Sequence, residues 1–104
     1  MHNRLQVGID FCQKRADLCL LFPEGQPLES HVAFDNSYLG FSGAKQLMLD
    51  ALDDYAFDGI DVSGEATGYL WLPFFLQLAA DPELELHDLR LHLLNPRWVK
   101  WFKK

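Results

Sequence analysis

The chain has 104 residues, of which 49% are hydrophobic and 13% aromatic. A chain of this length forms one domain, residues 1–104, and this composition favours a packed core over disorder. No apolar run approaches the roughly 18 residues of a membrane span and no signal-peptide pattern opens the sequence, so we expect a cytoplasmic protein without a membrane segment.

The charge distribution and the two cysteines indicate which partners and which redox state to expect. The formal net charge is −6, and all 15 acidic residues precede Arg90, whereas residues 90–104 carry five basic side chains and no acidic one. An acidic domain binds nucleic acid poorly unless cations or a local basic face intervene, and the basic end is a candidate for such a face. Cys12 and Cys19 lack a disulfide framework or a metal-ligand spacing, so we expect reduced thiols that pack as small apolar side chains.

Three strands are expected first. Alternating apolar residues predict strands at Arg4–Phe11, Ala16–Phe22 and Leu28–Phe34. Pro23–Pro27 is a turn signal between the second strand and the third. Because the connections are short, the three strands are predicted to form an antiparallel meander.

An amphipathic helix and a fourth strand follow. Apolar residues at helical spacing predict a helix with Ser42 as its N-cap, ending near Tyr55. Asp58 and Gly59 mark the turn into a strand at Ile60–Ser63. A helix between two strands implies a right-handed crossover, so this strand is expected to lie parallel to the first.

Two more helices and one more strand complete the pattern. The second helix is predicted at Tyr69–Ala80, with Pro73 in or near its first turn, and it is apolar nearly all round. An acidic loop leads to a fifth strand at Leu89–Leu94. The Asn-Pro pair after it starts a final helix, Arg97–Lys104.

The element order βββαβαβα predicts an α/β protein with a mixed five-stranded sheet, an antiparallel meander plus parallel strands, which is the ribonuclease H-like architecture. The first and fourth strands are neighbours in such a sheet, so Asp10 and Glu65 at their ends are expected to approach each other. Glycines flank Glu65 within Gly59–Gly68, which indicates close approach of another group rather than packing. Two adjacent carboxylates bind Mg²⁺ or Mn²⁺ through oxygen, as phosphoryl-transfer sites require.

Three segments carry a family resemblance: V-G-I-D at Val7–Asp10, G-E-A-T-G-Y-L-W-L-P at Gly64–Pro73, and L-L-N-P-R-W-V-K-W-F at Leu93–Phe102. In order and spacing they resemble the amino-terminal part of DEDD transposases, the insertion-sequence recombinases with a RuvC-like domain. The E-A-T-G and N-P-x-x-V-K-x-F pieces are fairly specific in combination, and the resemblance covers nearly all of the chain.

The resemblance implies a Mg²⁺-dependent enzyme that cleaves and joins DNA with four acidic ligands and uses a structured guide RNA. Asp10 matches the family's first acid and Glu65 its second, so both are expected to be catalytic and metal-binding. The other two acids belong to a K-T-D-x-x-D-A-like segment, and a nucleophilic serine to a further domain; neither maps onto this sequence. The family's D-V-S-K is also altered, to D-F-C-Q-K at Asp10–Lys14. We therefore expect a fragment or truncated relative that binds Mg²⁺ weakly and does not cleave DNA alone.

Other polar residues invite competing interpretations. The final helix offers a nucleic-acid interface of four basic side chains, Arg97, Lys100, Lys103 and Lys104. Its tryptophans suit base stacking, but such residues more often form the buried stripe of a helix. Asp61 is expected to be a strand-start charge facing solvent or a loop rather than a ligand, and His87 and His92 to be surface or edge residues.

Two functions other than that of a transposase are also considered from the sequence, an actin-like ATPase or kinase and a non-catalytic module. Actin-like sugar kinases and chaperone ATPases also open with a G-I-D strand, but they need a glycine-rich phosphate turn after the aspartate, and residues 11–15 contain no glycine. The stronger alternative is a non-catalytic module that folds, dimerises or binds a partner. Apolar surface on the second and final helices predicts a homo-oligomer in either case.

Overall fold

A computed structural model describes residues 3–65 and 68–94 of the chain. Its strands are β1 (Arg4–Phe11), β2 (Arg15–Leu21), β3 (Pro27–Asp35), β4 (Gly59–Glu65) and β5 (Leu89–Leu94). Its helices are α1 (Tyr38–Tyr55), α2 (Leu72–Ala80) and α3 (Pro82–Glu85). None of the described helices is both long enough and apolar enough to span a membrane.

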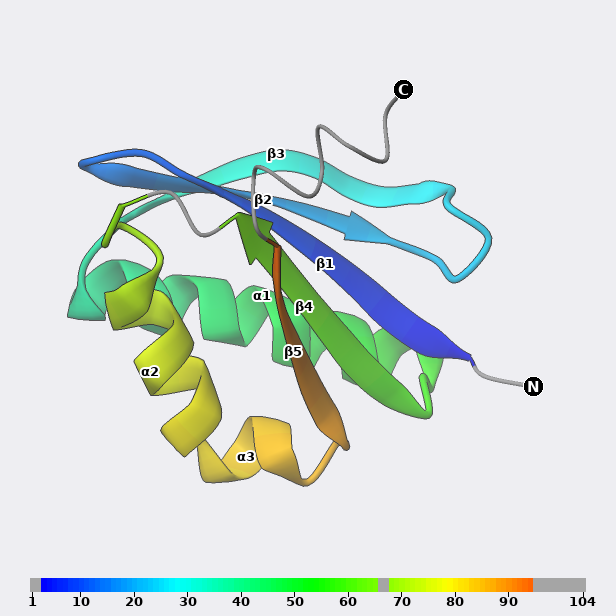
Figure 1. The fold of residues 1–104 in the computed structure, drawn as a ribbon. Coiled ribbons are helices and arrows are strands. Elements are labelled where there is room, and N and C mark those ends of the chain that lie inside the picture. Colours follow the sequence, from blue (N-terminus) through cyan, green and yellow to red (C-terminus); the bar gives the residue numbers. More distant parts are fainter. Residues whose placement is uncertain (1–2, 66–67, 95–104) are drawn as a thin grey trace.

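The five strands form one sheet in the order β3-β2-β1-β4-β5 (Figure 1). β2 runs antiparallel to both β1 and β3, whereas β4 runs parallel to both β1 and β5. The predicted meander, the parallel crossovers and the adjacency of the first and fourth strands are therefore confirmed. β1 lies at the centre, between the antiparallel and parallel halves of the sheet.

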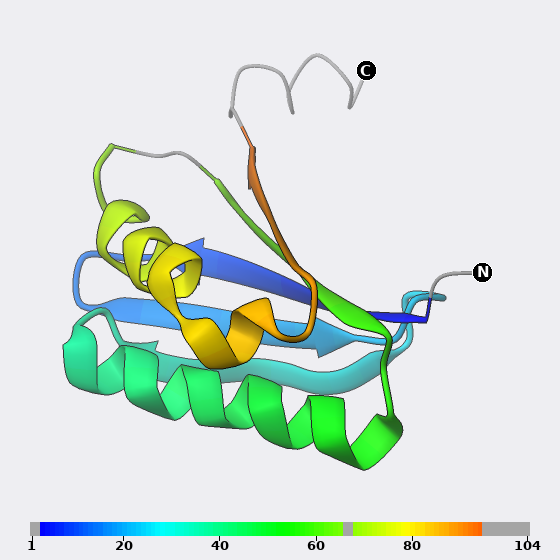
Figure 2. The same ribbon diagram turned by 90° about the horizontal axis from the view of Figure 1, so that it is seen from below.

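The three helices cover one face of the sheet (Figures 1 and 2). In β1 and β4, the side chains on this face are buried, and they stand side by side in the register Leu5↔Ile60 and Val7↔Val62. The alternate residues point to the other face, which carries no described helix. Because side chains alternate along a strand, every second residue of β1, β2, β4 and β5 is presented on this helix-free face.

The core lies between the sheet and the helices. Each helix contributes side chains that are at most 7% exposed: Phe41, Ala44, Met48, Ala51 and Leu52 from α1, Phe74, Phe75 and Leu78 from α2, and Leu84 from α3. The α1 residues recur at helical spacing, which places them on one side of the helix. Burial of such side chains stabilises the fold by about 1.5–3 kcal/mol each for the larger ones.

Helix boundaries differ from those predicted. α1 is capped by Ser37 rather than Ser42, because the Ser37 hydroxyl accepts a hydrogen bond from the Gly40 N–H at 3.2 Å. The earlier start lets Phe41 enter the core from the first turn. α2 begins at Leu72 rather than Tyr69, with proline in its first turn as predicted.

The acidic loop after α2 contains a further short helix, α3. The Asp81 carboxylate accepts hydrogen bonds from the N–H groups of Glu83 and Leu84, at 3.0 and 3.1 Å, and so caps it. Asp81 also pairs with Lys45 of α1 at 2.8 Å. Burial opposes ionisation of Asp81, but the hydrogen bonds from Lys45, Leu84 and Glu83 and the charge of Lys45 together outweigh it and lower the pKa. The final helix predicted at 97–104 lies outside the described residues.

Candidate functional site at the strand ends

Asp10 and Glu65 end neighbouring parallel strands. The pairing of β1 with β4 runs to Ile9↔Gly64, and the next step of that register sets Asp10 beside Glu65. Both acids are exposed and follow a buried residue, so both belong to the helix-free face. Neighbouring strands lie about 4.8 Å apart, which allows two carboxylates on one face to approach a single ion. The strand adjacency is confirmed; cation binding by the pair stays a prediction.

Aromatic packing fixes these two strand ends. The Phe11 ring meets Phe74 and Phe75 edge to face, with centroids 5.8 and 6.0 Å apart. A Cβ at Gly64 would lie 2.8 Å from Phe11 Cε2 and 3.2 Å from Phe75 Cε1, so only glycine fits there. The glycine before Glu65 is thus required for packing against aromatic rings. The close approach at Gly64 is that of two aromatic rings, and the role of Glu65 as a ligand stays a prediction.

Two further side chains lie near Asp10; sequence reasoning weighed Cys12 and favoured a core role for it, and it missed Asp17. Asp17 stands directly opposite Asp10 in the β1–β2 pair. Ligand atoms of Asp10, Cys12 and Asp17 all lie within 4.8 Å of one another. Asp17 also forms an ion pair with Arg15, whose Nε lies 3.2 Å from its Oδ2. The signal that was available is the hairpin register, since a tight turn after Cys12 sets residue 17 against residue 10.

The donor set at this edge fits a hard divalent cation. Asp10 and Asp17 offer carboxylate oxygens, which Mg²⁺ and Mn²⁺ prefer, whereas the Cys12 thiol suits softer metals. Among the described residues, Glu65 does not belong to the group whose ligand atoms lie within 4.8 Å of one another. Cys12 and Cys19 are free thiols, as predicted. Both are half-buried rather than part of the core.

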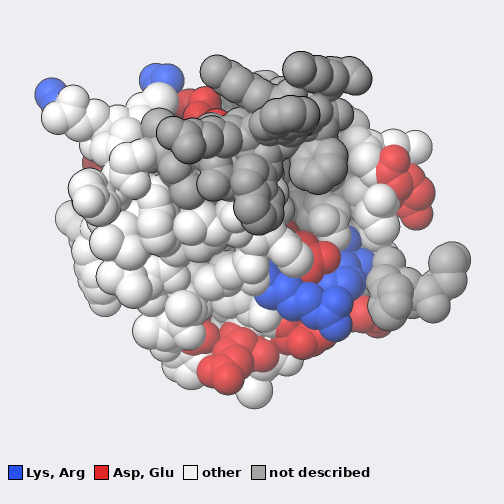
Figure 3. Space-filling model, viewed as in Figure 1, with Lys and Arg blue, Asp and Glu red and all other residues white. Residues whose placement is uncertain are grey.

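Basic side chains lie at both ends of the strands (Figure 3). The β1–β2 turn carries Lys14 and Arg15, both exposed. Arg15, Arg4, Lys45 and Arg90 each pair with a carboxylate, whereas Lys14 has no ion-pair partner among residues 3–65 and 68–94. The free cation of the described structure therefore lies two residues beyond the half-buried Cys12, at the same sheet edge as Asp10. Four predicted nucleic-acid contacts lie outside the described residues: Arg97, Lys100, Lys103 and Lys104.

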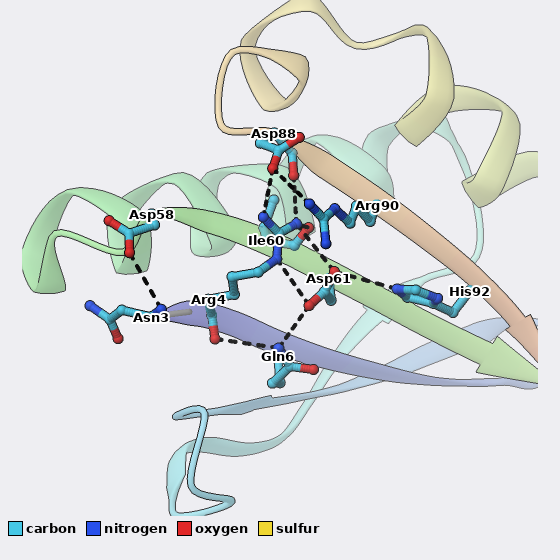
Figure 4. A network of polar contacts seen from close by, with 9 residues as sticks. All are labelled: Asn3, Arg4, Gln6, Asp58, Ile60, Asp61, Asp88, Arg90 and His92. Carbon is cyan, nitrogen blue, oxygen red and sulfur yellow. Dashed lines mark hydrogen bonds and ion pairs between the residues drawn. The ribbon is translucent and has the colours of Figure 1, made fainter. Parts of the chain in front are cut away.

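A second polar cluster lies at the beginnings of the parallel strands (Figure 4). Arg4, with 7% of its side chain exposed, donates to both oxygens of Asp61 at 3.1 and 3.2 Å. It also donates to the Asp88 carboxylate at 2.8 Å and to the carbonyl oxygens of Ile60 and Asp88 at 2.9 and 2.6 Å. A Cβ at Gly59 would overlap the guanidinium, so glycine makes room for it. The hydrogen bond with Asp61 is the main cause that raises the pKa of Arg4.

Asp61 is the centre of this cluster and not a solvent-facing charge, so that expectation was wrong. Besides Arg4, it accepts a hydrogen bond from Gln6 at 2.9 Å, and His92 Nε2 lies 3.3 Å from its Oδ1. Burial favours the neutral acid, yet the hydrogen bonds from Arg4, Gln6 and His92 lower the pKa of Asp61 to about 2. His92 is half exposed on the edge strand β5, as predicted. These contacts align the starts of β1, β4 and β5.

Neither a family model nor a curated protein matches the chain. Among solved structures, the chain is similar to T. thermophilus RuvC in complex with a Holliday junction substrate, with a TM-score of 0.55 and 14% sequence identity. That similarity covers 93% of this chain and 66% of the RuvC chain. A Ppx/GppA family member from Aquifex aeolicus is similar at a TM-score of 0.46 and 8% identity, over 91% of this chain and 36% of the other. The chain thus spans just under two thirds of the RuvC chain.

The likeness to RuvC concerns the fold. A mixed five-stranded sheet with helices against it, together with this structural neighbour, confirms the predicted ribonuclease H-like fold. At 14% identity, the similarity to RuvC assigns no role to individual residues of this chain.

Proposed function

We infer that this chain is the amino-terminal part of a Mg²⁺-dependent DEDD transposase that acts on DNA. The observation that carries the proposal is the parallel pairing of β1 with β4, which have Asp10 and Glu65 at their carboxyl ends on the same helix-free face. Two observations support it: the three sequence segments that resemble these recombinases, and a fold shared with a protein whose structure contains a Holliday junction.

Asp10 and Glu65 would hold the cation through carboxylate oxygens, with Asp17 within reach as a further oxygen donor. A divalent cation at such a site supplies Lewis acidity toward a phosphoryl oxygen and lowers the pKa of a bound water. The two strand ends orient the carboxylates, because Phe11 and Gly64 pack immediately beside them.

Asp10 and Glu65 match two of the family's four acidic ligands. Two carboxylates hold too few cations to balance the charge of both the nucleophile and the leaving group. The chain alone is therefore proposed to bind Mg²⁺ or Mn²⁺ weakly and to leave DNA uncut. Lys14, which has no ion-pair partner among the described residues, would contact a phosphate at the same edge. A role of Arg97, Lys100, Lys103 and Lys104 in the same contact stays a prediction from the sequence. A guide RNA belongs to the proposal only through the family resemblance.

A thermal-shift series with Mg²⁺, Mn²⁺ and ATP tests the function. We expect both cations to raise the Tm of the wild-type chain, and Glu65→Gln to abolish that rise. Asp53→Asn is the matched control, since Asp53 is an exposed carboxylate of α1 on the helical side. An equal rise in Glu65→Gln and the wild type would contradict the proposal, and a rise with ATP alone would favour the actin-like alternative.

One observation favours a second candidate, a module that binds another protein chain. α2 contains no charged residue, yet Leu76 on it is 60% exposed and Tyr69 just before it is 83% exposed. Such an apolar, uncharged surface is typical of an interface. A second copy of this chain is the partner proposed, because two acidic copies repel least where neither carries charge.

A further inference from the structure

The amide side chain of Asn36 joins the β1–β2 turn to Leu70, shortly before α2. Its Nδ2 donates to the carbonyl oxygen of Cys12 at 3.2 Å and to that of Leu70 at 3.0 Å. Cys12 follows Asp10 by two residues, and Leu70 follows Glu65 by five. One side chain thus bridges the β1–β2 turn and the segment that leads from β4 into α2.

Asn36 itself is held from both sides. Its backbone N–H donates to the Lys14 carbonyl at 3.0 Å, which adds a second hydrogen bond from Asn36 to the β1–β2 turn. Before it, Asp35 pairs with Arg15 at the end of β3, and after it Ser37 caps α1. The amide therefore projects from a fixed point between a strand and a helix.

The chemistry of the position requires an amide. Both Nδ2 protons are used, one for each carbonyl, and an aspartate at this position has no proton to donate. The Oδ1 atom is buried and has no hydrogen-bond partner among the described residues. An unsatisfied buried acceptor is unfavourable, so the contribution of this residue lies in its two donors.

The bridge lies where backbone pairing between β1 and β4 gives out. Their register runs to Ile9↔Gly64, one step before the two acids. Beyond that step, the contact of Phe11 with Gly64 and Phe75 is apolar and fixes no carbonyl direction. The Asn36 amide supplies the directional link, with donors aimed at one carbonyl on each side.

We propose that Asn36 is a positioning residue that sets the separation of Asp10 and Glu65. This proposal rests on the proposed function, because the separation of Asp10 and Glu65 matters for how well the two carboxylates share a cation. Removal of the amide takes the side-chain donor from both carbonyls, leaves that of Cys12 with the Arg15 N–H at 3.4 Å, and lets the turn and Leu70 move apart.

The test uses Mn²⁺ titration followed by electron paramagnetic resonance, on the whole chain. We expect Asn36→Ala to weaken the Kd for Mn²⁺ by about tenfold, the effect typical of a residue that orients metal ligands. Gln6→Ala is the matched control, because it removes an amide that donates to Asp61 at the opposite ends of the same strands. Gln6→Ala is expected to lower the Tm without changing the Kd. Equal affinity in Asn36→Ala and the wild type would overturn the proposal.

A second arm needs no metal and separates the two hypotheses. In metal-free protein, Asn36→Ala is expected to shift the amide resonances of Asp10 and Glu65, and Gln6→Ala to leave both in place. If the wild type binds Mn²⁺ no better than Glu65→Gln, the proposed function fails, and the amide shifts alone decide the role of Asn36. If the amide resonances of Asp10 and Glu65 do not move in Asn36→Ala, the positioning role of Asn36 is overturned. Should Asn36→Ala fail to fold, Asn36→Ser, which keeps one donor, is expected to give smaller changes in the same directions.

Discussion

Arg4 and Asp61 meet across β1 and β4, with the guanidinium Nε 3.1 Å from the carboxylate Oδ2. The same two strands carry exposed acids at their other ends, Asp10 as the last residue but one of β1 and Glu65 as the last of β4. At the strand starts, the ion pairs of Arg4 balance the acidic charges and align the strands. At the strand ends, the proposed cation would balance the charges of Asp10 and Glu65.

Replacement of Arg4 by Met is expected to lower the free energy of unfolding by about 3 kcal/mol, because it removes the cationic partner of the Asp61 carboxylate, which is only 16% exposed. Urea unfolding measures the change. Arg15→Met is the control, since that arginine is 59% exposed and its pair with Asp17 contributes about 0–1 kcal/mol. Equal losses in the two variants would contradict the assignment of Arg4 as a structural cation.

Acid is expected to destabilise the fold through Asp61. Its folded pKa of about 2 lies below the ordinary value of 3.8, so its contribution is present above about pH 4 and is lost as the pH falls toward 2. The contribution amounts to about 2 kcal/mol. Urea unfolding from pH 5 to pH 2 should show the gap between wild type and Asp61→Asn closing over that range. Parallel curves would show that Asp61 does not titrate as described.

Strands were predictable from sequence because their apolar alternation is local. β1 at Arg4–Phe11 and β5 at Leu89–Leu94 have the bounds that the pattern predicts. Helix starts were not, because Ser37 and Ser42 are equally good caps by type, and only the position of Phe41 against the core selects the first.

Polar contacts were the part that sequence reasoning missed. The partner of Asp61 lies 57 residues away, and periodicity carries no information about such a pair. Asn36 reads as a loop residue because the two carbonyls it binds become neighbours only when the meander and α2 have packed. Asp10 and Glu65 could be proposed from the sequence because each lies at the end of an apolar strand, which is a local signal, and their role stays a prediction.

Gly64→Ala is expected to disturb the strand ends. The new methyl group would press on the rings of Phe11 and Phe75, and such overpacking costs about 1–3 kcal/mol. Gly8→Ala is the matched control in the neighbouring strand, since a Cβ there meets nothing within 4 Å. Urea unfolding measures stability, and the Mn²⁺ titration should weaken only for Gly64→Ala. Identical behaviour of the two variants would exclude Gly64 as a packing position.

Lys14→Gln is expected to weaken DNA binding and to lower the salt dependence of the affinity by about one counterion. Ser42→Asp makes the same change in net charge on the helical side of the molecule and is expected to have a smaller effect. Fluorescence anisotropy with a labelled duplex at several salt concentrations checks both. Equal losses would indicate that only the overall charge matters and would remove Lys14 from the proposed interface.

Leu76→Glu is expected to shift the chain toward monomer, because it places a charge on the exposed apolar face of α2. Leu86→Glu introduces the same charge at a leucine that is 86% exposed after α3, and it is expected to leave the mass unchanged. Light scattering at high micromolar concentration distinguishes the two outcomes. A wild-type chain that is monomeric at that concentration would contradict self-association through α2.

The Arg4 cluster also determines when the sheet is completed during synthesis. Arg4 binds Asp61 and Asp88, which lie 57 and 84 residues further along the chain, whereas β1, β2 and β3 are joined by short turns. Local hairpins form before distant contacts, so the meander is available early and β4 and β5 join it late. At about 5–20 residues per second, several seconds separate the two events on the ribosome. Throughout that interval β1 presents an unpaired edge, and a nascent chain is most prone to aggregation there.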